Sequence, residues 1–398
     1  MRNLIICCVL VLAHNALASE EPALPEPTGS YAVGTAALLF TDMARPEIFT
    51  DDPDDHREVT ARAWYPAEPA PEVAPAPYYE NGGDIVRMFD YPAYLANLAT
   101  HSLPGARVAE AEEKYPVILF NHGWGEHAVQ NTVLMEELAS HGYVVFSLAH
   151  HYEAKFWTYP DGRVEFINMG SPRFQSIMQE QSKPEAMQLL QASFEAREVA
   201  AQESLFQLMV ETMPTLLGET PRHWAEDISF VIGELDSLNK YNALFAGRLD
   251  LEKLGVMGMS MGGAAAGQVC LDGDRIRAAI NMDGGLLGDL ADTVVAVPMM
   301  YVGSRRFIGY DEVFSAHASN DSYTLIIGES DHYDLTDFTL LNRNHMMIGT
   351  VDGERMLKIL NDYTLAFFDF YLRGIDSGFL TGQKKPYPEA EFQAHRKH

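Results

Sequence analysis

The sequence predicts an α/β fold with a mostly parallel central sheet flanked by helices on both faces. From Tyr115 onward, short apolar runs alternate with longer stretches of helical character, an order that is typical of consecutive β-α-β units. Two of the runs lead directly into glycine-rich turns, which places both turns at one edge of the sheet. The chain has 398 residues, enough for one large domain of this kind or two smaller ones.

Composition narrows the possible functions. The chain is 47% hydrophobic and 21% charged, which excludes disorder, collagen and coiled coil as descriptions of the whole molecule. It carries 56 acidic against 28 basic residues, a formal net charge of −28. Such a surface repels phosphate backbones and anionic bilayers, so the sequence predicts no nucleic-acid binding and no stable membrane insertion. A neutral or apolar substrate remains compatible.

The first residues have the features of a signal peptide. Arg2 precedes an apolar run from Leu4 to Ala13, and Ala16-Leu17-Ala18 is a small-residue cleavage site before Ser19. The apolar run is too short to span a bilayer. We therefore expect residues 1–18 to be removed after Ala18 and the mature protein to be secreted or periplasmic.

The three cysteines fit this interpretation. Cys7 and Cys8 would be lost with the signal peptide, which leaves Cys270 without an intrachain partner. A lipid anchor on Cys8 is the alternative, and the shortness of the preceding apolar run disfavours it. No disulfide is expected in the mature chain.

The elements follow in order along the chain. Residues 19–30, rich in Pro and Glu, predict a flexible leader, and the domain proper is expected to span residues 31–380. Glu58–Tyr65 alternates apolar and polar residues like a strand. The later predicted strands are Val117–Phe120, Tyr143–Leu148, Leu254–Met257, Ala278–Met282, Val294–Val302 and Tyr323–Ile327. The predicted helices are Val129–Ser140, Trp224–Leu238, Gly262–Leu271, Asp311–Ala318 and Gly353–Arg373, before a polar tail at 381–398.

Residues 152–223 interrupt this alternation. Asp161-Gly162 predicts the turn of a hairpin, and Pro184–Met213 has helical, Met-rich character. The segment is expected to be either a packed helical insertion or a cap over a binding cleft, and an insertion at this place can be both.

The most informative motif is a serine between an apolar run and a helix of small residues. Leu254–Met257 leads into Gly258-Met259-Ser260-Met261-Gly262 and then into Gly263 and AAAGQVC. This is the strand–turn–helix context of a nucleophile elbow, where glycines two residues before and after the serine avoid a collision. We expect Ser260 to be the catalytic nucleophile, with Gly258 and Gly262 shaping the turn. An idle serine in a tight β-α turn is the alternative.

A second glycine-rich turn, His122-Gly123-Trp124-Gly125, directly follows Val117–Phe120. Such a turn can aim a backbone N–H at an oxyanion, so the N–H groups of Trp124 and Met261 are the expected oxyanion hole. His122 and Gly123 are expected to support the loop rather than to catalyse.

A serine nucleophile needs a histidine base, and in this order of elements the base follows the serine. Among the later histidines, His332 lies in the loop directly after the apolar run Tyr323–Ile327. The others fall before that strand, in a helical stretch or in the polar tail, namely His317, His345, His395 and His398. His332 is therefore the predicted base.

The acid that orients the base has two candidate positions. Asp283 ends the run Ala278–Met282 at the same edge of the sheet, whereas Gly303–Arg306, after the next run, contains no carboxylate. Asp311 comes later and is expected on a helix. We therefore favour Asp283, with a turn aspartate that caps its own loop as the non-catalytic alternative.

These residues together resemble the secreted and type II platelet-activating factor acetylhydrolases, which are α/β-hydrolases related to dienelactone hydrolases and cutinases. The resemblance rests on the HGWG loop, the GMSMGG elbow, the early acid, and Arg57 followed by Ala63-Trp64-Tyr65-Pro66. It covers roughly residues 31–375, and the elbow reads Gly-Met-Ser where many relatives have Gly-His-Ser. The resemblance implies a serine esterase for short or oxidised acyl chains, with an oxyanion hole at Trp124 and Met261.

The expected function is thus hydrolysis of a small-molecule or lipid ester by a Ser260–His332–Asp283 triad, without a metal or organic cofactor. A polyester or cutin hydrolase is one alternative, since it would use the same machinery on an open groove. A peptidase is another, although on this fold it typically carries a further large domain. A non-enzymatic binding protein of the same fold is disfavoured, because such proteins usually lack a member of the triad and all three are present here. The sequence does not predict an oligomeric state.

Overall fold

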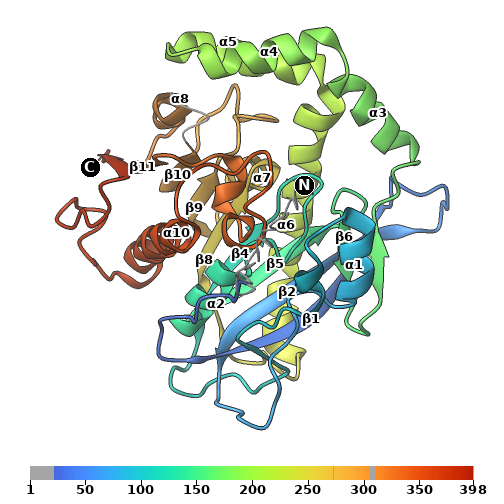
Figure 1. Ribbon diagram of the computed structural model, residues 1–398, viewed down its shortest axis with the longest axis vertical. Helices are drawn as coiled ribbons and strands as arrows, with labels where there is room; N and C mark the ends of the chain where they lie inside the picture. The colour runs from blue at the N-terminus through green and yellow to red at the C-terminus, as the bar shows by residue number, and fades with distance from the viewer. Residues whose placement is uncertain (1–21, 272, 305–309, 398) are drawn as a thin grey trace, which may run out of the picture.

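The computed structural model, shown in Figure 1, describes residues 22–271, 273–304 and 310–397. Its centre is a ten-stranded sheet in the order β12-β11-β10-β9-β8-β4-β5-β2-β1-β3. The strands of this sheet are β1 Ala32–Pro46, β2 His56–Ala67, β3 Ser102–Pro104, β4 Tyr115–Asn121, β5 Val144–His150, β8 Leu249–Met259, β9 Ile276–Met282, β10 Met299–Ser304, β11 Ser322–Ile327 and β12 Ala390–His395. A separate hairpin consists of β6 Phe156–Thr158 and β7 Val164–Phe166.

The helices lie on both faces of the sheet and beyond its edge. They are α1 Gly82–Phe89, α2 Thr132–Ser140, α3 Pro172–Gln181, α4 Pro184–Glu195, α5 Val199–Thr212, α6 Thr220–Tyr241, α7 Met261–Val269, α8 Tyr310–Ala316, α9 Phe338–Leu341 and α10 Gly353–Phe368. Short helical turns complete them: the 3₁₀ turns η1 Ala93–Asn97 and η4 His332–Leu335, and the π turns η2 Pro214–Glu219 and η5 Asp369–Arg373.

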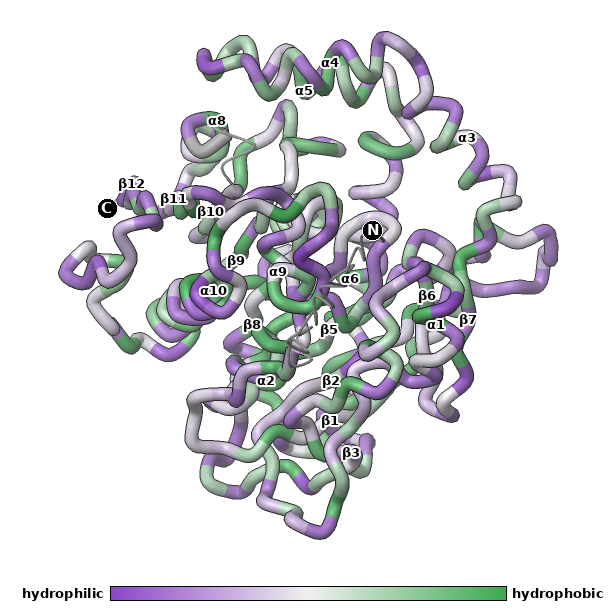
Figure 2. Tube along the Cα trace, viewed as in Figure 1, coloured by the Kyte–Doolittle hydropathy of each residue, from purple (hydrophilic) through white to green (hydrophobic). Residues whose placement is uncertain are grey.

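The middle of the sheet consists of six parallel strands, in the order β11-β10-β9-β8-β4-β5. β4, β5, β10 and β11 are buried along their whole length, because helices cover both faces of a parallel sheet. Along β4, Val117 and Leu119 face the layer of α6 and α7, while Ile118 and Phe120 face the layer of α2 and α10. Figure 2 shows hydrophobic stretches around the central strands β5 and β8, whereas the outer helices α4, α5 and α10 mix hydrophilic and hydrophobic residues.

β2 reverses this direction and lies antiparallel to both β1 and β5. The predicted mostly parallel α/β fold is therefore confirmed. The predicted strand Val294–Val302 begins later than expected, at Met299, because pairing with β9 starts only after Pro298, which has no N–H to donate.

The insertion between β5 and α6 has the predicted hairpin and helices. The helical segment Pro184–Met213 forms two helices, α4 and α5, which lie along the top of the view in Figure 1, above α8. The break lies at Ala196, which is extended, and the Arg197 guanidinium donates to the carbonyls of Phe194 and Ala196 at 2.8 Å.

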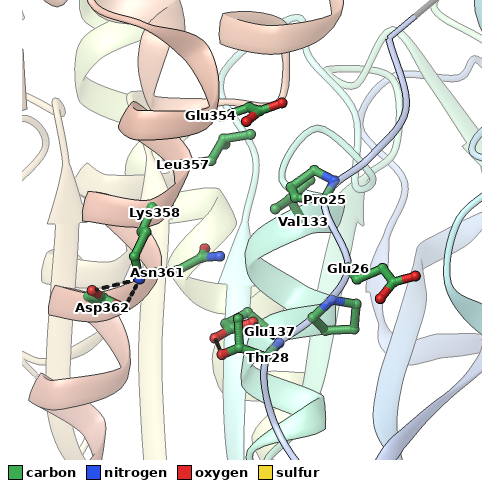
Figure 3. A pocket seen from close by; sticks show the side chains of 11 residues that line it. Pro25, Glu26, Thr28, Val133, Glu137, Glu354, Leu357, Lys358, Asn361 and Asp362 are labelled. Carbon is green, nitrogen blue, oxygen red and sulfur yellow. Dashed lines mark hydrogen bonds and ion pairs between the residues drawn. The ribbon is translucent and has the colours of Figure 1, made fainter.

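Residues 22–30 differ from the expected flexible leader. The Thr28 N–H donates to Glu137 on α2 at 2.8 Å, the Gly29 N–H donates to Ser140 Oγ at 3.0 Å, and Leu24 is buried. These bonds hold the segment along α2, and a groove of about 190 Å³ remains between it and α10 (Figure 3). The predicted signal peptide, residues 1–18, lies outside the described residues.

The expected polar tail also contains an element of the sheet. Residues Ala390–His395 form β12, which pairs antiparallel with β11 from Ser322 to Ile327. The predicted closing helix is present as α10 and η5, and it ends at Gly374 in the left-handed conformation with a φ of 70°.

Candidate active site

Ser260 lies in a sharp turn between β8 and α7. It has a φ of 55° and a ψ of −119°, a conformation that costs a non-glycine residue about 1–3 kcal/mol and that recurs at functional sites. The Ser260 N–H donates to the carbonyl of Met282 at 2.7 Å, which ties the turn to the end of β9. The serine is thus held at the carboxyl edge of the parallel strands.

The glycines on either side of Ser260 allow close backbone approach. A Cβ on Gly258 would lie 2.2 Å from the carbonyl oxygen of Gly262, and one on Gly262 would lie 2.1 Å from the carbonyl oxygen of Asn121. Both distances are too short for a side chain. The first contact is the collision across the turn that the motif predicts, and the second packs the turn against the end of β4.

Asp283 directly follows β9 and is also in a left-handed conformation, with a φ of 55°. Its fully buried carboxylate accepts from the Ser304 N–H through Oδ1 and from the Ser304 hydroxyl through Oδ2, both at 2.8 Å. His332 Nδ1 lies 2.8 Å from Oδ2. The acid is thus fixed by the end of β10 and faces the histidine.

His332 begins η4, the short turn that follows β11. Asp331 caps this turn in a capping box with Asp334, so the start of the loop is fixed by its own sequence. The structure therefore brings His332 and Asp283 into contact. Asp283 directly follows Met282, whose carbonyl accepts a hydrogen bond from the Ser260 N–H.

Other histidines that follow Ser260 lie elsewhere. His317 Nε2 lies 3.1 Å from Glu203 on α5, and His395 ends β12. His345 packs against the ring of Tyr333 with 4.3 Å between ring centroids. His398 lies outside the described residues.

The loop after β4 lies directly beside Ser260. A Cβ on Gly123 would lie 3.5 Å from Ser260 Cβ, and the Gly123 N–H is held by Gln130 Oε1 at 3.1 Å. In the part of the chain that the structure describes, the N–H groups of Trp124 and Met261 donate to no neighbouring residue. Met261 is the first residue of α7, so its N–H also carries the positive end of the helix dipole.

His122 supports this loop from below. Its Nδ1 lies 2.7 Å from the carbonyl of Gly123, and its Nε2 accepts from the His150 N–H at 3.2 Å. Burial, and then the neighbouring His150, lowers the pKa of His122 to about 3, so the ring is neutral. A neutral ring that donates through Nδ1 and accepts through Nε2 satisfies both contacts, as expected for a structural histidine.

A buried polar network lies under the same loop. Arg57 is fully buried and bonds Asp227 at 2.7 Å, and His150 Nδ1 lies 2.8 Å from the same carboxylate. Burial alone would raise the pKa of Asp227, but Arg57 and His150 bring it well below its usual range. His150 Nε2 lies 3.1 Å from Asn121 Oδ1 at the end of β4, which connects Arg57 with the loop.

The insertion contacts the site at two places. The ring of Phe174 on α3 stacks on Trp124, with centroids 5.9 Å apart and an interplanar angle of 16°. Phe206 on α5 is buried and lies so close to Gly285 that a Cβ there would come within 2.8 Å of its ring. Aromatic side chains from the insertion thus pack beside both the loop that follows β4 and the loop that follows β9.

Two features of the site were not found from the sequence. Ser304, which holds Asp283, ends β10, the strand after which the sequence has no nearby carboxylate, so its position was a usable signal. Glu126, which binds both Lys155 and Tyr333, was missed because its partners come from separate loops.

No helix within residues 22–271, 273–304 and 310–397 combines the length and apolar character needed to cross a membrane. Nor do three or more His, Cys, Asp or Glu side chains of those ranges gather in a way that could hold a metal ion.

The arrangement defines a class of protein. A mostly parallel sheet that carries a strained serine turn after a central strand, with an aspartate–histidine pair after later strands, is the α/β-hydrolase fold. The structure is similar to a solved structure of a ferulic acid esterase from Streptomyces cinnamoneus, with a TM-score of 0.71 and 26% sequence identity. The match covers 93% of this chain and 99% of that one.

Sequence comparison gives the family. The sequence-family model of platelet-activating factor acetylhydrolase, isoform II, matches residues 16–383 of the chain. The chain therefore belongs to this family of esterases. The family resemblance inferred from the sequence is thereby confirmed.

Individual relatives are distant. A platelet-activating factor acetylhydrolase of Cavia porcellus is 25% identical over 67% of this chain and 59% of its own length. That of Bos taurus is 21% identical over 90% and 79%. A probable 1-alkyl-2-acetylglycerophosphocholine esterase of Arthroderma benhamiae is 22% identical over 97% and 98%.

Proposed function

We propose that the chain is a secreted serine esterase that hydrolyses short-chain or oxidised acyl esters through an acyl-enzyme. The observation that carries the proposal is the 2.8 Å contact between Asp283 and His332 Nδ1, at the edge of the sheet where the strained Ser260 turn lies. An aspartate on Nδ1 holds the histidine in the tautomer that carries its proton on Nδ1, so that Nε2 can act as the proton acceptor.

In the acylation step, Ser260 Oγ attacks the carbonyl carbon of the ester while His332 Nε2 takes its proton. The carbonyl oxygen becomes an oxyanion, and the N–H groups of Trp124 and Met261 are the donors proposed to stabilise it. Asp283 stabilises the imidazolium. His332 then gives the proton to the leaving alcohol, and the carbonyl is restored as an acyl-Ser260 ester.

In the deacylation step, water replaces the alcohol. His332 removes a proton from the water as the oxygen attacks the acyl carbon, and the same two N–H groups bind the second oxyanion. The proton then passes from His332 to Ser260 Oγ, which releases the carboxylic acid and restores the free enzyme.

Aromatic esters are the second candidate substrate class. The likeness to a ferulic acid esterase and the stacked rings of Trp124 and Phe174 favour an acyl group that is itself a flat ring. Turnover should be compared on p-nitrophenyl acetate, a truncated oxidised phospholipid, methyl ferulate and a polyester film. Preference for the phospholipid supports the first proposal, preference for methyl ferulate supports the second, and release of product from the film indicates an open groove.

Acyl-chain length tests the role of the insertion as a cap. If Phe174 and Phe206 close the acyl pocket, kcat/KM should fall steeply beyond short acyl chains, because overpacking costs about 1–3 kcal/mol, or roughly 5- to 150-fold. Phe174→Ala should flatten this profile. The matched control is Phe379→Ala, since Phe379 packs against Tyr363 on α10. A wild-type profile that stays flat to long chains would instead indicate an exposed groove.

Export tests the proposed localisation. When the full chain is expressed in a cell with a general secretory pathway, the exported protein should begin at Ser19 after cleavage behind Ala18. Intact mass and N-terminal sequencing identify the cleavage site. Recovery of uncleaved chain in the cytoplasm alone would contradict secretion.

A further inference from the structure

Three loops of the site meet at the side chain of Glu126. Glu126 lies two residues beyond Trp124 and is only 5% exposed. Its Oε1 accepts from the Tyr333 hydroxyl at 2.6 Å and from Lys155 Nζ at 2.8 Å. Tyr333 directly follows His332, and Lys155 belongs to the loop after β5. One carboxylate therefore joins the oxyanion loop, the histidine loop and a third loop.

Backbone contacts place this carboxylate beside the nucleophile. The Glu126 N–H donates to the Gly123 carbonyl at 2.9 Å, and the Lys155 N–H donates to the Glu126 carbonyl at 2.8 Å. A Cβ on Gly123 would lie 3.5 Å from both Glu126 Cγ and Ser260 Cβ. The glycine that adjoins Ser260 thus also adjoins Glu126.

Glu126 accepts charge-assisted hydrogen bonds from Tyr333 and Lys155. Burial, and then the charge of Glu126, raises the pKa of the Tyr333 phenol, so the phenol keeps its proton and donates it. A phenol bound to a carboxylate makes a short, charge-assisted hydrogen bond. The Lys155 ammonium offsets the cost of burying the carboxylate, and Lys155 is held in turn by the Tyr91 hydroxyl at 2.9 Å.

We propose that Glu126 and Tyr333 are positioning residues, which fix the oxyanion loop relative to His332 so that the donor and the base are in register before the ester binds. This inference rests on the proposed function. Neither side chain is assigned a step in the chemistry. Their role is to keep the Trp124 N–H and His332 at a fixed separation, and a displacement of about 1 Å in such a site can cost on the order of 100-fold in rate.

Tyr333→Phe tests the proposal, because it removes one hydroxyl and keeps the ring that stacks on Phe338. We expect kcat on a short ester to fall about 10- to 100-fold while KM changes less than twofold, as for an interaction that acts only in the transition state. Tyr65→Phe is the matched control. It also removes a buried hydroxyl, bonded to the Ala106 carbonyl at 2.9 Å, but lies on β2 and should leave kcat unchanged.

Glu126→Gln provides a second variant that keeps the shape of the side chain. It should lower kcat as well, and the Glu126→Gln/Tyr333→Phe double variant should lose less than the product of the two single losses. A Tyr333→Phe enzyme with wild-type kcat, or a loss that Tyr65→Phe reproduces, would overturn the inference. So would fully multiplicative losses in the double variant.

The two levels of the proposal fail differently. Organophosphate labelling of wild-type Ser260 tests the serine-esterase mechanism by itself. If Ser260 is labelled but Tyr333→Phe behaves like wild type, only the positioning role is wrong. If Ser260 is not labelled and Ser260→Ala stays active, the proposed function itself is wrong.

Discussion

Replacing Ser260 by alanine is expected to lower kcat for ester hydrolysis by on the order of 10⁶-fold, to background in most assays. The substitution removes the oxygen that attacks the ester carbonyl. A water molecule at the same place would not be held in position for the attack. The fold should persist, because alanine has the same Cβ as serine in the strained turn at a φ of 55°. The Ser260→Ala variant should also no longer be labelled covalently by an organophosphate, as measured by peptide mass spectrometry.

Ser182→Ala serves as the control for this variant. Ser182 is the residue directly after α3, where its hydroxyl donates to the Gln179 carbonyl at 2.9 Å, so its loss should change neither turnover nor labelling. If Ser260→Ala retained turnover or label, the nucleophile would have to be another residue, and the elbow would be only a tight turn.

Replacing Asp283 by asparagine is expected to lower kcat by on the order of 10³–10⁴ without unfolding the protein. The reason lies in the partners of the carboxylate. Oδ1 accepts from the Ser304 N–H, so the single oxygen of an asparagine would stay there, and its NH₂ would face His332 Nδ1. That NH₂ favours the tautomer protonated at Nε2, which cannot take the serine proton.

Asp311→Asn is the comparison that separates the two candidate acids. Asp311 lies on α8, after β10, and the substitution there should change kcat little. Both variants should be measured on a short ester at neutral pH. If the Asp311 variant were inactive and the Asp283 variant active, the acid would have been assigned to the wrong strand.

The sequence was informative where local pattern determines structure. The parallel strands are buried on both faces, so they read as continuous apolar runs, and the elbow, the HGWG loop and the histidine loop each follow such a run. β1 was missed because its burial alternates only from Leu39 to Met43 and its register depends on β2, with a bulge between Asp42 and Pro46.

Contacts between distant segments were beyond any local pattern. Tyr333 and Glu126 are 207 residues apart in the chain, and only the order of the strands brings them together. The same holds for residues 22–30. Their Pro- and Glu-rich composition indicates flexibility, yet Thr28 and Gly29 find partners on α2 that the composition does not reveal.

The two outermost strands bear on aggregation. An open ten-stranded sheet has two rows of unpaired backbone N–H and C=O groups, which invite pairing with another molecule. At one end, β3 has only three residues, finishes at Pro104 and pairs with Val33–Thr35 of the longer strand β1. At the other end, β12 covers the fully buried β11 and turns Glu391, Gln393 and His395 outward. The apolar strand β11 is thus prevented from pairing edge to edge with another chain, because the more polar strand β12 lies on its outer side.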